Sequence, residues 1–223
     1  MGARRPVDRV PGSLGCAGSG ARPVDLASEA ARWSHGGSDR DEAFLIAAAG
    51  LSPDVKIAGV IGLRSATQET ADGYVYTVST RRDGSLWRVN TKTEQIEKIG
   101  QAAVGLADYV TSLDVDPSGR FLYDTPGAHG GSQLGGTPIV QFDTKLRTRK
   151  VIAFLHPSYL KKYGYVSLGT FGSALSLDGR TLYVTWNGNR GGLTQGRYGF
   201  DTCRMTAIHI PASERGGGTA NAK

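Results

Sequence analysis

The sequence predicts an all-β protein assembled from repeated sheets. Residues 116–125 read DPSGRFLYDT and residues 177–186 read LDGRTLYVTW, while residues 71–78 form a weaker third copy. Each copy is a turn that ends in glycine, followed by an apolar strand built around tyrosine. The shared glycines lie about 46 and about 60 residues apart, near the length of a four-stranded propeller blade. We therefore expect a repeat architecture of about three such blades.

Short strands with turn residues between them recur from residue 56 onward. In order, we expect strands near residues 57–63, 74–79, 85–90 and 96–99 (blade one), 111–115, 121–125, 139–143 and 150–155 (blade two), and 171–177, 181–187 and 204–210 (blade three). The side chains alternate with a period of two: Leu113, Val115 and Leu122 share one face, and Asp114 and Asp116 share the other.

Composition divides the chain into three parts. Residues 1–40 are rich in Gly, Arg, Ala, Ser and Pro without sustained periodicity, so we expect a disordered segment. Residues 41–212 form the partial propeller, and residues 213–223 form a flexible tail. The short apolar run at residues 43–49 fits a strand or a helical turn equally well.

The repeated turn and strand carry a resemblance to known proteins. Residues 116–123 and 176–185 place a Pro-Asp-Gly-type turn before a Leu-Tyr-Val strand, and in this they resemble YVTN-type and gluconolactonase-like β-propeller repeats. The resemblance covers about residues 55–211 and implies the fold, but no single activity. In gluconolactonase-like relatives, Glu, Asn and Asp side chains hold a divalent ion on the central channel. The resemblance thus implies a divalent cation such as Ca²⁺ at Asn187, although no matching Glu is present in these blades.

The number of blades is below that of a closed ring, which needs about four to eight. This chain supplies three, and the last lacks a strand. Three explanations stay open: the chain is a fragment of a longer or truncated gene product, two copies close a ring as a homodimer, or a strand near residues 44–48 completes an open array.

The long connections predict where a site would be built. They span residues 126–138, 156–170 and 188–202, and in propeller blades all three belong to the same face of the disc. Long loops in compact domains are usually functional or disordered, and loops on a rigid scaffold commonly form binding sites.

Two histidines on this face are candidates for catalysis. His129 sits in the glycine-rich stretch 127–132, and His156 precedes Pro157. Either could act as acid, base or metal ligand. The plainer alternative is a loop histidine bonded to the backbone.

Five further residues are candidates for ligand binding. Tyr159 and Tyr163 suit a binding rim, because tyrosines pack and hydrogen-bond at low entropic cost; the alternative is that their rings are buried against the disc. Asn187, Asn189 and Arg190 could bind a ligand, or could form an ordinary turn.

These features predict a binding module for a small molecule, sugar or peptide. The alternative is a metal-dependent lactonase-like or lyase-like enzyme, and the sequence leaves open which is correct. The net charge is +6, but the basic residues are scattered and no nucleic-acid motif accompanies them, so we do not expect nucleic-acid binding. No apolar run approaches the length of a membrane span and no secretory signal is visible, so no compartment is assigned.

Overall fold

The structure is a computed structural model that describes residues 42–45, 55–58, 62–79, 84–105, 109–126, 136–190, 193–194 and 197–215. All described residues belong to one compact unit, Asp39–Lys223. The segment predicted to be disordered, residues 1–40, lies outside the described residues, as does most of the predicted tail.

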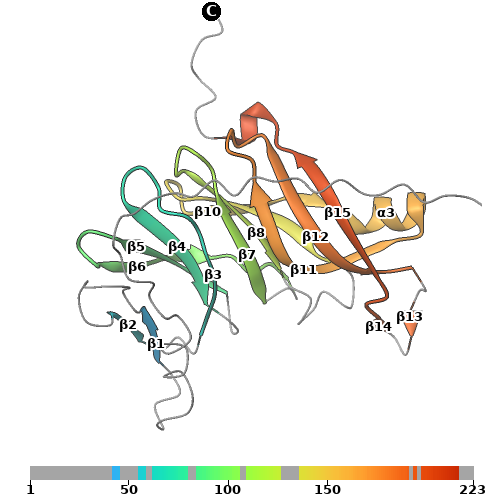
Figure 1. Cartoon of the computed structure of the whole chain (residues 1–223), viewed down its shortest axis with the longest axis horizontal. Helices are drawn as coiled ribbons and strands as arrows, with labels where there is room; N and C mark the ends of the chain where they lie inside the picture. The colour runs from blue at the N-terminus through green and yellow to red at the C-terminus, as the bar shows by residue number, and fades with distance from the viewer. Residues whose placement is uncertain are drawn as a thin grey trace, which may run out of the picture. The chain divides into compact units, whose positions relative to one another are not determined.

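Three antiparallel sheets follow one another along the chain (Figure 1). Sheet 1 contains β3 (Leu63–Ala66), β4 (Tyr74–Ser79), β5 (Ser85–Asn90) and β6 (Ile96–Gln101). Sheet 2 contains β7 (Val110–Val115), β8 (Phe121–Pro126), β9 (Pro138–Asp143) and β10 (Thr148–Phe154). Sheet 3 contains β11 (Val166–Leu175), β12 (Thr181–Asn189) and β15 (Thr202–His209). Within each sheet the strands pair in chain order, as in propeller blades.

Smaller elements surround these sheets. A separate hairpin joins β1 (Glu42–Leu45) to β2 (Val55–Ala58), and a second one joins β13 (Leu193–Thr194) to β14 (Arg197–Tyr198). Within the part of the chain that the structure describes, the helices are α3 (His156–Tyr163) and the 3₁₀ turn η2 (Ala212–Glu214). None of the described helices is long and apolar enough to cross a bilayer.

The all-β fold class with three blade-like sheets is confirmed, and within the described residues the third sheet contains three strands. The first strand of blade one was predicted too early: β3 begins at Leu63, because residues 55–58 pair with β1 instead. The apolar run after residue 42 begins as a strand.

The predicted connection 156–170 was also wrong in detail. Its first half is the helix α3, which has Pro157 in its first turn and ends at Gly164 in the left-handed conformation. Its second half already belongs to β11, which begins at Val166 and not at residue 171.

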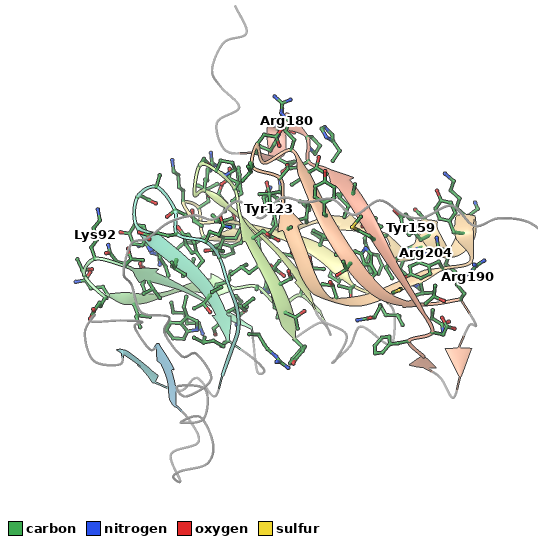
Figure 2. All side chains as sticks on the ribbon, in the orientation of Figure 1. Lys92, Tyr123, Tyr159, Arg180, Arg190 and Arg204 are labelled. Carbon is green, nitrogen blue, oxygen red and sulfur yellow. The ribbon has the colours of Figure 1, made fainter. Side chains whose placement is uncertain are left out.

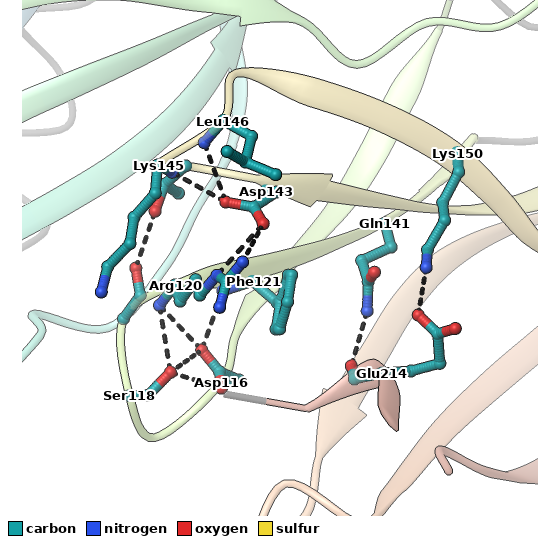
Figure 3. A network of polar contacts seen from close by, with 12 residues as sticks. Asp116, Ser118, Arg120, Phe121, Gln141, Asp143, Lys145, Leu146, Lys150 and Glu214 are labelled. Atoms are coloured by element: carbon teal, nitrogen blue, oxygen red, sulfur yellow. Dashed lines mark hydrogen bonds and ion pairs between the residues drawn. The ribbon is translucent and has the colours of Figure 1, made fainter. Parts of the chain in front are cut away.

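The repeated turns explain why the sequence repeats. In the turn of sheet 2, the Asp116 carboxylate accepts the N–H groups of Arg120 and Phe121, each at 2.9 Å (Figure 3). Gly119 adopts a φ of 72°, which residues other than glycine rarely do. The other two turns place Gly73 and Gly179 in the same region.

Consecutive sheets pack through two apolar clusters. The first joins sheets 1 and 2 and includes Tyr76, Leu86, Leu122 and Phe142. The second joins sheets 2 and 3 and includes Phe121, Tyr123, Ile139, Leu182, Val184 and Trp186. Neighbouring first strands also lie side by side, β3 with β7 and β7 with β11.

Polar contacts reinforce the packing of sheet 2 on sheet 3. On the first strands, Ser173 Oγ donates to the Asp114 carboxylate, which also accepts the Leu175 N–H at 3.1 Å. At the opposite edge of sheet 3, after β15, the Glu214 carbonyl in η2 accepts hydrogen bonds from Tyr123 Oη and Gln141 Nε2 on sheet 2. Figure 3 shows the contact with Gln141. The segment after β15 is thereby tied back to sheet 2.

Candidate ligand-binding end of the sheets

The described parts of the three long connections lie at one end of sheets 2 and 3, which we call the loop end. Gly136 lies against α3 and β11: a Cβ atom there would come within 2.8 Å of His156 Cβ and 3.0 Å of the Ser167 carbonyl oxygen. Thr137 Oγ1 donates to the Leu168 carbonyl. Val166, at the start of β11, pairs with Asn189, at the end of β12.

Helix α3 contributes two of the candidate residues. The Tyr159 ring is half-buried against the second apolar cluster. The Tyr163 ring stands perpendicular to it at a centroid distance of 5.4 Å and is exposed, with the Lys162 ammonium 5.1 Å from its centroid. Tyr159 therefore anchors the helix to the sheets, and Tyr163 is accessible from solvent.

His156 begins α3 in a half-buried position, 6.1 Å between ring centroids from Phe154. Burial lowers the pKa of His156 below its ordinary value of 6.5, because the charged imidazolium loses hydration. The imidazole is therefore predominantly neutral at pH 7. The other catalytic candidate, His129, lies outside the described residues.

Asn189 and Arg190 meet at the carboxylate of Asp201. This carboxylate accepts Asn189 Nδ2 at 3.1 Å, the Arg190 backbone N–H at 3.0 Å and Thr202 Oγ1 at 2.8 Å. The Asn189 side chain is buried, whereas Arg190 is exposed. The Asn189–Asp201 contact thus closes the base of the β12–β15 connection and leaves the Arg190 guanidinium on the surface.

Arg204 also lies at the loop end, although it was not among the site residues predicted from the sequence. Its guanidinium lies 4.7 Å from the centroid of the Tyr165 ring, within the range of a cation–π interaction. Tyr165 is fully buried, and burial raises its pKa to about 12. Alternation along β15 was the available signal, since it places Arg204 on the face of sheet 3 that carries Trp186, and Cys203 and Met205 on the opposite face.

Positive charge gathers at the loop end. In Figure 2, Tyr159, Arg190 and Arg204 lie toward the same end of the sheets, far from Lys92 and Arg180. Lys161 and Lys162 occupy the last turn of α3. Among the described residues of α3, the start of β11, the end of β12 and the start of β15, the one carboxylate is Asp201, which already accepts three hydrogen bonds.

Asn187 occupies a different surface of sheet 3. Trp186 points into the second cluster, so Asn187 faces the opposite way. It lines an open depression of about 440 Å³ together with Thr185, Trp186, Cys203, Arg204 and Met205. These neighbours offer no carboxylate, whereas Ca²⁺ needs six to eight oxygen ligands. No group of three or more His, Cys, Asp or Glu side chains suited to a metal occurs within the described residues, so the metal role of Asn187 stays a prediction.

The sequence matches no protein-family model and is not detectably similar to any curated protein. The structure is similar to TolB from Acinetobacter baumannii, with a TM-score of 0.44 and 17% identity over 71% of this chain and 31% of that one. It is also similar to the tricorn protease, with a TM-score of 0.43 and 11% identity over 77% of this chain and 16% of that one.

A third similar structure is the β-propeller domain of the Trilobed protease from Pyrococcus furiosus, described as having an open velcro topology. Its TM-score is 0.35, with 11% identity over 71% of this chain and 46% of that one. This chain thus spans less than half the length of each of these three structures. The similarity concerns the β-propeller fold alone.

Proposed function

We propose that the loop end binds a ligand that carries a carboxylate, such as an acidic sugar or an acidic peptide. The observation that supports this is that four basic residues, Lys161, Lys162, Arg190 and Arg204, belong to the elements of the loop end, whereas the one carboxylate described in those elements, Asp201, already accepts hydrogen bonds. An anion would compensate this charge.

Each residue has a distinct part in the proposed site. The guanidinium groups of Arg190 and Arg204 suit carboxylates, because arginine presents paired donors in a fixed plane. The exposed Tyr163 ring offers an apolar surface beside them. Asp201 would act indirectly, by fixing the backbone at Arg190.

The test is calorimetric titration with a galacturonic acid oligomer and with a glutamate-rich peptide, each beside its uncharged counterpart. We expect only the acidic probes to bind, more weakly at high salt. Arg204→Ala and Arg190→Ala should each weaken binding by about tenfold, in line with the loss of a charged hydrogen bond. Arg180→Ala, at the opposite end of sheet 3, is the matched control.

Equal binding of charged and uncharged probes would contradict the proposal. An equal loss in Arg180→Ala would also contradict it, because the effect would then follow net charge and not the loop end.

A metal-dependent enzyme is the second candidate, and the half-buried position of His156 at the start of α3, where burial lowers the pKa of its imidazole, is in its favour. A neutral imidazole can bind a metal or accept a proton at pH 7. If this candidate is correct, Ca²⁺ or Zn²⁺ should raise the melting temperature, and His156→Ala, His129→Ala or Asn187→Ala should abolish the rise. Unchanged melting in the presence of either ion would count against it.

A further inference from the structure

The tyrosine of each repeat occupies an equivalent place in its sheet. In every repeated turn, the N–H of the first turn residue donates to the carbonyl that opens the following strand: Thr70 to Tyr74, Asp116 to Phe121 and Ser176 to Thr181. Two residues beyond these carbonyls stand Tyr76, Tyr123 and Tyr183. Each of these tyrosines therefore projects from the same side of its sheet, the side that meets the next sheet in the chain.

Two of the three tyrosines are buried between sheets. Tyr76 is 3% exposed in the cluster between sheets 1 and 2, and its hydroxyl reaches the Gly119 carbonyl in the turn of sheet 2 at 3.5 Å. Tyr123 is 0% exposed in the cluster between sheets 2 and 3. Tyr183 is 43% exposed. Sheets 1 and 2 thus bury this tyrosine against the following sheet, whereas the equivalent tyrosine of sheet 3, Tyr183, is exposed to solvent.

The surroundings of Tyr183 are also apolar and exposed. Tyr183 pairs with Ala207 on β15 and Ala174 on β11, and Met205 pairs with Thr185 on the same side. Met205 is 70% exposed, whereas Ile139 on the equivalent side of sheet 2 is 0% exposed. We call this surface the outer face of sheet 3. Its residues correspond to those that form one side of the interface between sheets 2 and 3.

Sheet 1 carries the complementary half. Tyr76 and Val78 point toward sheet 2, so Val75 and Thr77 face away from it, in the position of Leu182 and Val184, through which sheet 3 packs on sheet 2. Register pairs Val75 with Val89, and Thr77 with Ala66. This surface, the outer face of sheet 1, holds a depression of about 270 Å³ lined by Leu63, Arg64, Ser65, Ala66, Val75, Thr77 and Val89. Within the single chain Thr77 and Val89 are buried, Leu63, Ser65 and Val75 are half-buried, and Arg64 and Ala66 are exposed.

We propose that the outer face of sheet 3 docks on the outer face of sheet 1 of a second copy of this chain. The contact would continue the series already formed between sheets 1 and 2 and between sheets 2 and 3, with Tyr183 as the third buried tyrosine. Made reciprocally by two copies, it gathers six sheets, within the four to eight of closed propellers. It does not depend on the proposed ligand.

The experiment measures mass by light scattering over a range of concentrations, together with the labelling rate of the exposed Cys203 thiol by a maleimide. The protein carries Cys16→Ser, so that Cys203 is its only thiol. We expect twice the chain mass, with labelling at least tenfold slower in the pair because Cys203 lies on the outer face of sheet 3.

Three variants test which surfaces form the contact between the two copies. Met205→Asp and Tyr183→Asp should give single chains that label quickly, and Ala66→Glu should do the same from the sheet 1 side. All three positions are exposed, so the single chain should keep its fold. Leu146→Asp, at a 66% exposed site in the turn between β9 and β10, should leave the pair intact.

A single-chain mass at every concentration, with fast labelling throughout, would overturn the proposal. So would a pair that survives Met205→Asp and Tyr183→Asp, or one that survives Ala66→Glu alone, because sheet 1 would then not be the partner surface. A mass that rises without limit would exclude a closed pair.

Discussion

The carboxyl group of Asp124 lies in an environment that disfavours its charged form. This group is fully buried on β8, and neither oxygen has a hydrogen-bond partner among the described residues. Burial raises its pKa well above the ordinary value of 3.8, and the nearby positive charge of Arg149 offsets this only in part. The folded protein therefore binds a proton at Asp124 more tightly than the unfolded chain does. The stability that this group contributes is present below the unfolded pKa and is lost as the pH rises through the folded pKa.

Asp124→Asn should stabilise the protein at neutral pH, because it removes a buried charge while keeping the shape of the side chain. We expect a gain of about 1–3 kcal/mol near pH 7, the cost of an unsatisfied buried group, and a smaller gain near pH 4. Urea denaturation at both pH values measures the difference.

Asp178→Asn is the control of opposite sign. Hydrogen bonds from the Ser176 hydroxyl and the Arg180 N–H lower the pKa of Asp178. That substitution should destabilise the protein near pH 7, and less so in acid. A loss of stability in Asp124→Asn that is the same at both pH values would contradict the assignment.

At the scale of single elements, the repeated turn was the best-predicted feature. Its glycines and the strands that follow them were found from sequence because turn chemistry and alternation are local signals. Helix α3 was missed, because Pro157 was taken as a loop residue and not as the opening of a helix. The early start of β11 was missed because its pairing with Asn189 at the far end of β12 is not a local signal.

The turn itself can be tested through its hydrogen-bond acceptor. Asp116→Ala should lower the free energy of unfolding by about 1–3 kcal/mol, because the buried N–H of Phe121 loses its carboxylate partner. Asp116→Ser should cost less, since Ser176 Oγ accepts the equivalent N–H groups of Arg180 and Thr181 in sheet 3. Chemical denaturation measures both. Equal losses in the two variants would show that an acceptor at this position is not what matters.

For the whole molecule, the sequence predicted the order of the sheets but only part of the candidate site. Loop lengths indicated one end, since the three long connections of this chain are of the kinds that share one face of a propeller. The sequence could not show which polar side chains already have partners within the chain. Asn189 donates a hydrogen bond from its side-chain amide to Asp201, and Arg204 belongs to the site because its guanidinium lies over the Tyr165 ring. Such contacts join residues of different strands, so they depend on the assembled sheets.

The two interfaces also predict a contrast between equivalent tyrosines. Tyr123→Ala should lower the free energy of unfolding by about 3–5 kcal/mol, as for other large buried side chains. Tyr183→Ala should lower it by less than about 1 kcal/mol in dilute solution, because that ring is already largely in water. Urea denaturation at low protein concentration makes the comparison. Similar losses in both variants would mean that the outer face of sheet 3 is covered within one chain.

The pairing of strands in chain order has a consequence for biosynthesis. Each strand of sheets 1 and 2 finds its partner in the segment made just before it, so loop closure within a sheet is short and rapid. Sheet 1 can form while later residues are still on the ribosome, and sheet 2 can then fold against it as a template. Tyr76 and Tyr123 would each be exposed to solvent until the next sheet is synthesised. At each of these stages the growing chain would expose the apolar face of its most recent sheet until the following sheet packs on it.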